Sequence, residues 1–245
     1  MRNDLKTLLV LGATSAVAHA YLRRAADDGV FSRYILTARN QEKLEIVRQD
    51  IAARSGVETV SVMSHLGDAS QVQEAFDQVL QLSDQIDECL LAYGVLGGVP
   101  PAVLLETNFL SAAIWLEALA TQFERQSYGR MAVIGSVAAD RGRQSNYLYG
   151  ASKAGLERLC EGLSHRFAQH QDIHFCCVKP GFIETPMTAH LDRSGLLWSR
   201  PVQIANIVRR ALLKRRARVY APWFWRYIML IVRLLPRSIF HKTKL

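Results

Sequence analysis

A tyrosine and a lysine stand four residues apart in the stretch YLYGASKAGLERL, whose apolar spacing is that of a helix. Within a helix this spacing puts Tyr149 and Lys153 on the same face, one turn apart. A tyrosine hydroxyl can give a proton to an oxygen, but its ordinary pKa of about 10 is high for that exchange near neutral pH. A nearby ammonium would favour the phenolate and lower this pKa. The two residues could also be ordinary surface residues, so their surroundings must decide between a catalytic pair and a helix surface.

Apolar runs typical of buried strands alternate with segments of helical periodicity along most of the chain. The runs lie at 7–13, 34–39, 58–64, 88–94, 130–137, 173–180 and 218–222. Near-continuous apolar strands that alternate with helices indicate a parallel sheet covered on both faces. The sequence therefore predicts one α/β domain over residues 1–222, a doubly wound (Rossmann) parallel sheet of about seven strands with its ligands at the carboxyl ends of the strands.

The first run ends in LGATSAVAHA, where Gly12 marks a sharp turn into the next helix and small residues follow. Such a turn lets backbone N–H groups at a helix N-terminus approach a pyrophosphate, although G-x-G-x-x-G is absent and a tight turn without a ligand is the alternative. After the second run, Arg39 stands where an NAD site would have an acidic residue. Its guanidinium can pair with a 2′-phosphate, which favours NADP(H) over NAD(H), or it could be a solvated residue at the start of the next helix.

Further residues complete a pattern that resembles the short-chain dehydrogenase/reductase family over residues 5 to 220. Ser136 ends the fifth run thirteen residues before Tyr149, and Asn108 lies in a long helical segment upstream. In order and spacing, Asn108, Ser136, Tyr149 and Lys153 match the Asn-Ser-Tyr-Lys catalytic tetrad of that family. The resemblance implies that Tyr149 exchanges the proton, and that Lys153 lowers its pKa and binds the nicotinamide ribose. It implies further that Ser136 orients the carbonyl and that Asn108 holds a water.

The same resemblance implies a set of cofactor contacts. The first turn is similar to the family's T-G-x-x-x-G-x-G, with Leu11, Ala16 and Ala18 replacing three expected residues, and PG at 180–181 matches the turn beside the nicotinamide. AYG at 92–94 stands where the family usually has Asn-Ala-Gly, and a histidine replaces the aspartate that contacts adenine. The expected cofactor-binding residues are Gly12, Thr14, Ser15, Ala16, Val17, Arg39, Asn40, His65, Leu66, Ala92, Tyr93, Gly94, Tyr149, Lys153, Pro180, Gly181, Ile183 and Thr185.

Charge and cysteine usage bear on the other classes of function. The net charge is +8, yet residues 1–192 carry 17 basic and 22 acidic residues, whereas residues 193–245 carry 13 basic residues and no acidic one. This division argues against a nucleic-acid partner and favours a local contact with an anionic surface. The four cysteines lack zinc spacing, and three of them lie in strand-like runs, so we expect reduced thiols, no metal site and a cytoplasmic location. The polar segment 1–6 does not resemble a signal peptide.

Residues 223–245 predict a basic, aromatic, amphipathic C-terminal helix. The segment PWFWRYIMLIVRLLP is too short to span a bilayer, which takes about 20 residues, and two of its arginines share one helical face. A basic stripe opposite Trp and Leu side chains is typical of a helix that lies in the membrane interface. We expect this segment either to contact the inner face of the membrane or a lipid-linked substrate through 214–245, or to pack between subunits of a homodimer or homotetramer. A hydrophobic helix that closes the substrate pocket is a further alternative.

GATS, AYGVLGG and the aromatic tail are similar to one subgroup of the family, the decaprenylphosphoryl 2-keto-pentose reductases. The subgroup resemblance implies an NADPH-dependent carbonyl reductase or alcohol dehydrogenase that reduces a keto sugar on a polyprenyl phosphate, after a flavin-dependent oxidase. Two alternatives stay open. The chain could act on a small soluble carbonyl or alcohol, or it could be a catalytically idle NADP(H)-binding module.

Overall fold

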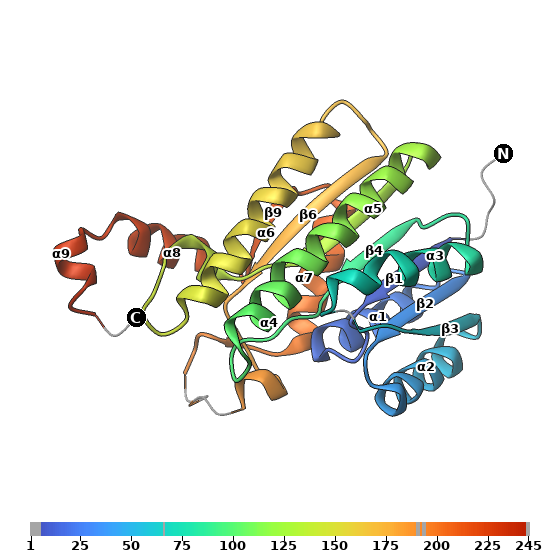
Figure 1. Cartoon of the computed structure of the whole chain (residues 1–245), viewed down its shortest axis with the longest axis horizontal. Helices are drawn as coiled ribbons and strands as arrows, with labels where there is room; N and C mark the ends of the chain where they lie inside the picture. Colours follow the sequence, from blue (N-terminus) through green and yellow to red (C-terminus); the bar gives the residue numbers. More distant parts are fainter. Residues whose placement is uncertain (1–5, 66, 190–191, 193–194, 244–245) are drawn as a thin grey trace.

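The computed structural model describes residues 6–65, 67–189, 192 and 195–243. Seven strands form one parallel sheet in the order β3-β2-β1-β4-β5-β6-β9, with helices on both faces (Figure 1). This confirms the predicted doubly wound Rossmann sheet in a single domain. The strands are β1 (Thr7–Leu11), β2 (Arg33–Ala38), β3 (Glu58–Met63), β4 (Glu88–Leu91), β5 (Gly129–Ile134), β6 (Ile173–Pro180) and β9 (Arg218–Ala221).

The strands are apolar on both sides because each face of the sheet carries a helical layer. In β1, Leu9 and Leu11 belong to one core cluster, while Leu8 and Val10 belong to the other, as the alternation of side chains along a strand requires. The first cluster includes side chains of α3 (Val72–Leu82), α5 (Ser111–Gln126) and α6 (Tyr147–Arg166). The second includes side chains of α1 (Ala16–Asp28), α2 (Gln41–Ser55) and α7 (Pro201–Leu213).

One helical run, residues 101–126, is long and apolar enough to cross a membrane by length and composition. It comprises α4 (Pro101–Leu105), a π-helical turn (Glu106–Leu110) and α5. Trp115, Leu119 and Phe123 of α5 are fully buried in the core against the sheet. Packing in the core therefore accounts for the apolar character of this run.

The C-terminal segment forms two helices, α8 (Trp225–Leu234) and α9 (Arg237–Phe240), where the sequence predicted one. Pro236 separates them, since proline has no N–H to donate within a helix and suits a helix start. Both lie at one end of the molecule (Figure 1).

Helix α8 packs against the body of the protein. Its residues Trp225, Met229 and Val232 form a small core with Val137, which follows β5. The guanidinium of Arg141 donates to carbonyl oxygens at the end of α8, including that of Leu235 at 2.7 Å. Residues on both sides of position 222 therefore contribute to one packed structure.

Candidate active site

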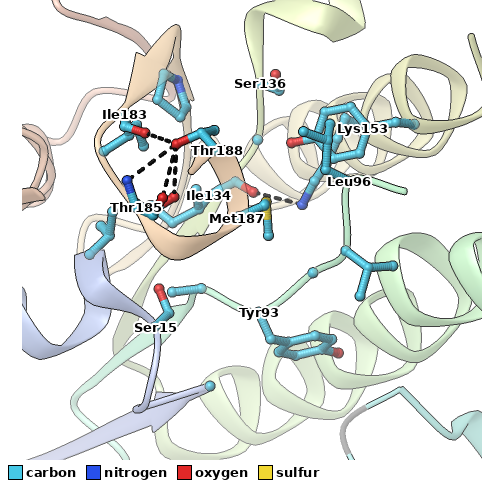
Figure 2. Close-up of a pocket in the computed structure, with 18 of the residues that line it drawn as sticks. Ser15, Tyr93, Leu96, Ile134, Ser136, Lys153, Ile183, Thr185, Met187 and Thr188 are labelled. Atoms are coloured by element: carbon cyan, nitrogen blue, oxygen red, sulfur yellow. Dashed lines mark hydrogen bonds between the residues drawn. The ribbon is translucent and has the colours of Figure 1, made fainter. Parts of the chain in front are cut away.

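A cavity of about 480 Å³ lies along the carboxyl ends of the strands, where the strand order reverses between β1 and β4. Its walls are residues that follow β1, β2, β4, β5 and β6, and Figure 2 shows it in close-up. Crevices of this kind at the switch point of a doubly wound sheet are where such folds bind ligands, and the volume is in the range of small-molecule sites. The fold thus forms a cavity at the edge of the sheet where the sequence predicted ligand binding.

The predicted acid–base pair lines this cavity. Tyr149 and Lys153 lie on the first turns of α6, and the Lys153 Nζ is 5.9 Å from the centroid of the Tyr149 ring. Lys153 is 3% exposed, and its ammonium donates to the carbonyl oxygen of Ile134 at 3.1 Å. Ser136, which follows β5, lines the same cavity (Figure 2). Its hydroxyl oxygen accepts a hydrogen bond from the N–H of Ala138 at 3.1 Å. The structure therefore brings together three of the four predicted catalytic side chains.

Burial dominates the proton affinities of this pair. It raises the pKa of Tyr149 above the ordinary value, and a hydrogen bond with Ser136 acts in the opposite direction. Burial also lowers the pKa of Lys153 to about 8. We expected the lysine to hold the pKa of Tyr149 low, but in this structure removal from water outweighs that effect. At neutral pH the phenol is therefore protonated, which is the form that can donate a proton.

Asn108 is buried in the π-helical turn and is not among the residues that line the cavity. Its Oδ1 accepts from the N–H of Val95 at 2.8 Å, and its Nδ2 donates to the carbonyl oxygen of Val95 at 2.7 Å. A Cβ on Gly94 would lie 2.8 Å from the same Oδ1. Asn108 therefore fixes the segment after β4 that forms one wall of the cavity. Its expected role in holding a water stays a prediction.

The first turn has the geometry of a phosphate cradle. Gly12 has a φ of +87°, and a Cβ there would lie 2.7 Å from the Cβ of Tyr93, so both conformation and space require glycine. Ser15 caps α1 and accepts weakly from the N–H of Ala18 at 3.5 Å. The N–H groups of a first helical turn have no partners within the helix and favour an anion. A dinucleotide pyrophosphate therefore fits the turn at Gly12.

Arg39 is exposed and lines the cavity directly after Ala38, at the end of β2. Its neighbour Asn40 is outside the cavity wall, where its side chain caps α2 by accepting from the N–H of Lys43 at 2.9 Å. His65 is exposed and is also outside the wall. These positions do not support the predicted cofactor contacts of Asn40 and His65, and Leu66 lies outside the described residues.

No group of three or more His, Cys, Asp and Glu side chains that could hold a metal occurs in the described part of the chain.

Most of the other predicted cofactor residues lie in the cavity wall. They are Gly12, Thr14, Ser15, Ala16, Val17, Ala92, Tyr93, Gly94, Pro180, Gly181, Ile183 and Thr185. In Figure 2 Thr185, Met187 and Thr188 stand on one side of the cavity and Leu96 and Lys153 on the other.

Sequence reasoning missed several wall residues. Arg143 and Asn146 lie between two predicted site residues, and this position could have drawn attention to them. Trp225 gives no such signal, because only the fold lays its indole over Gly181, where a Cβ would lie 1.9 Å from the ring. The glycine at 181 is thus required by close packing of an aromatic ring.

Comparisons with known proteins agree with this geometry. The family model described as short chain dehydrogenase matches residues 6–194. An oxidoreductase of Streptomyces coelicolor that is described as uncharacterised is 29% identical over 97% of this chain and 95% of its own. A 3-oxoacyl-(acyl-carrier-protein) reductase of Aquifex aeolicus is 27% identical over 83% of this chain and 88% of its own. Among solved structures, a short-chain dehydrogenase from Sphingobium yanoikuyae in complex with NADPH has a TM-score of 0.80 at 20% identity, covering 96% of this chain and 98% of that one.

Proposed function

The chain belongs to the short-chain dehydrogenase/reductase family, so it is an NAD(P)-dependent oxidoreductase of carbonyl and hydroxyl groups, and we propose that it works as an NADPH-dependent carbonyl reductase. The observation that carries the proposal is that Tyr149, Lys153 and Ser136 face one cavity together with the Gly12 turn. An idle NADP(H)-binding module would have no need for a buried lysine one helical turn from a half-buried phenol in the cavity wall. Oxidation of NADPH by 2,3-butanedione, followed at 340 nm, tests it, and saturable turnover is expected.

The residues of the site divide the chemistry between them. When bound, NADPH supplies the hydride that reaches the carbonyl carbon. The Ser136 hydroxyl donates to the carbonyl oxygen and orients it. The protonated Tyr149 then gives its proton to that oxygen as negative charge develops. The Lys153 ammonium stabilises the phenolate that this transfer leaves behind.

We propose that Arg39 selects the phosphorylated cofactor. A charge-assisted hydrogen bond contributes about 1.5–3 kcal/mol, which corresponds to tenfold or more in selectivity. Arg39→Gln should therefore lower the ratio of kcat/KM for NADPH to kcat/KM for NADH at least about tenfold, while Lys43→Gln, at another exposed cation nearby, should leave it unchanged. Kinetics with both cofactors measure the ratio. Wild-type turnover that is equal or faster with NADH would contradict the preference.

We propose a keto sugar on a polyprenyl phosphate as the substrate, with a flavin-dependent oxidase as the enzyme that forms it. The subgroup resemblance supports this choice, as does an aromatic helix that lines the cavity with Trp225 and exposes other apolar side chains. The oxidised product of such an oxidase should be reduced with a higher kcat/KM than 2,3-butanedione. A small soluble carbonyl that is reduced better would favour the alternative substrate class.

The outward face of α8 supports docking on an anionic membrane. Tyr227, Leu230 and Leu234 of α8 and Trp223 in the turn before it recur at helical spacing, and they are between 50% and 73% exposed. Arginines on the same helix border this apolar face, and the 13 basic residues of the tail have no acidic neighbours in sequence after residue 192. Lysines and arginines near an anionic surface contribute about 1 kcal/mol each. We therefore propose a cytoplasmic enzyme, a homodimer or homotetramer, that binds reversibly to the inner face of the membrane.

Substitution of the exposed face tests this docking without opening the cavity. The double variant Trp223→Ser, Leu234→Ser should reduce flotation with phosphatidylglycerol vesicles at least about fivefold, because it removes two large apolar side chains from the interface. The control Val202→Ser, Leu213→Ser removes two exposed apolar residues of α7 and should float like wild type. Equal flotation of both variants would exclude membrane docking by this face. A lower oligomer mass of the Trp223→Ser, Leu234→Ser variant on sedimentation would assign the face to a subunit contact.

A further inference from the structure

Three buried polar atoms in the cavity wall lack a hydrogen-bond partner among the described residues. They are Arg143 Nε, Asn146 Oδ1 and Trp225 Nε1. Buried polar groups are nearly always paired, because an unpaired one costs about 1–3 kcal/mol. Three of them in the wall of one cavity indicate that a ligand supplies the missing partners. Each belongs to a residue that the roles of Ser136, Tyr149 and Lys153 leave unused.

Arg143 brings to this wall a half-buried cation that forms no ion pair with a described residue. Burial lowers the pKa of its guanidinium, and the charge of Asp140 acts in the opposite direction. Asp140 Oδ1 accepts from Lys179 Nζ at 2.7 Å and from the Tyr220 hydroxyl at 3.2 Å, whereas its Oδ2 has no hydrogen-bond partner among the described residues, Arg143 included. An arginine side chain stays protonated in proteins, so the cost of partial burial persists until an anion pairs with it.

The two sides of this region are held rigidly. Trp225 is 4% exposed, lies over Gly181 and meets the Phe182 ring edge-on at 5.6 Å between centroids. Arg141, two residues before Arg143, donates a hydrogen bond to the carbonyl oxygen of Leu235 at the end of α8. The central carbon of its guanidinium lies 3.8 Å from the centroid of the Phe240 ring. The loop with Arg143 is thereby tied to the helix with Trp225, so their polar atoms are prepared before a ligand arrives.

We propose that Arg143, Asn146 and Trp225 form a subsite for an anionic, hydroxylated part of the carbonyl substrate. The Arg143 guanidinium binds an anionic oxygen of a phosphate ester or a carboxylate, and Trp225 Nε1 donates to an oxygen of the same molecule. Asn146 Oδ1 accepts from a hydroxyl group. This inference rests on the proposed carbonyl reductase activity in one respect. That activity places the reacting carbonyl at the Tyr149 end of the cavity and so leaves Arg143, Asn146 and Trp225 for the rest of the substrate.

Binding of three small ketones tests the subsite separately from turnover. All three compounds contain a ketone and a hydroxyl group. Dihydroxyacetone is uncharged, hydroxypyruvate adds a carboxylate, and dihydroxyacetone phosphate adds a phosphate. Calorimetry on protein saturated with NADP⁺, which occupies the Arg39 region, gives their dissociation constants. At least one of the two anionic ketones should bind to the wild type at least about tenfold more tightly than dihydroxyacetone does. Which of them binds more tightly shows whether the subsite takes a carboxylate or a phosphate.

Arg143→Gln should weaken binding of that anionic ketone at least about tenfold and leave dihydroxyacetone within twofold, while Arg143→Lys should recover part of the loss. The control Arg125→Gln, at an exposed position near the end of α5, should bind like wild type. Equal affinity of wild type for all three ketones, or equal losses for charged and neutral ketones in Arg143→Gln, would overturn the subsite. NADPH oxidation by the same ketones is measured in separate samples of the same variants, supplied with NADPH in place of NADP⁺, and reports on the proposed function. Selective binding without turnover would therefore contradict the reductase and not the subsite.

Discussion

Tyr149→Phe lowers kcat for carbonyl reduction at least about a hundredfold and changes the dissociation constant of NADPH less than about threefold. The hydroxyl is the group that gives the proton, and a positioned general acid contributes about 10²–10⁴ in rate. Phenylalanine keeps the ring in its half-buried position on α6, and removal of the hydroxyl releases its hydrogen bond with Ser136. Steady-state kinetics and a fluorescence titration with NADPH measure the two quantities.

Tyr147→Phe is the matched control, since Tyr147 is on the same helix, two residues earlier, and is 62% exposed. It should keep wild-type turnover. If Tyr149→Phe retained wild-type kcat, Tyr149 would not be the acid, and the proposed mechanism would fail even if NADPH still bound.

Lys153→Met should lower kcat/KM at least about a hundredfold without lowering the melting temperature. Lys153 Nζ lies 5.9 Å from the centre of the Tyr149 ring. Unit charges at about that separation interact by about 3 kcal/mol at an effective dielectric constant of 20, which is about a hundredfold in rate. The ammonium is buried with a pKa lowered to about 8, so it weakens the folded state while it serves the reaction. Methionine has a similar volume and removes the buried charge.

Calorimetric unfolding and NADPH kinetics check the two parts of this prediction. Lys214→Met, at the exposed end of α7, controls for the loss of a lysine and should change neither quantity. A variant that lost activity together with several degrees of melting temperature would indicate a structural role for Lys153. Full activity would remove the electrostatic role.

The sheet could be predicted from the sequence because its strands are buried on both faces. Strand β1 is an example, because its residues Leu8, Leu9, Val10 and Leu11 are all fully buried. Such a strand is a continuous apolar run, which can be recognised in the sequence without knowledge of the tertiary contacts. Tyr149 and Lys153 could be placed for a similar reason, since their spacing requires only one turn of helix.

Other features depend on contacts that no spacing encodes. The sequence suggested that Lys153 would lower the pKa of Tyr149, but the balance depends on burial, which exists only in the folded chain. Asn40 was expected at the cofactor and instead caps α2. Trp225 reaches the cavity because α8 folds back onto Gly181, 44 positions earlier in the sequence. Long-range packing of this kind is invisible to local pattern analysis.

The most direct test of the central claim is transfer of deuterium from NADPH labelled at C4 of the nicotinamide to a carbonyl substrate. With 2,3-butanedione, we expect deuterium on the carbinol carbon of the product, with transfer at least about a hundredfold slower in Tyr149→Phe. Tight binding of labelled NADPH with no deuterium in the product, for either 2,3-butanedione or the oxidised polyprenyl-phosphoryl pentose, would contradict the account and leave a nucleotide-binding module without this chemistry.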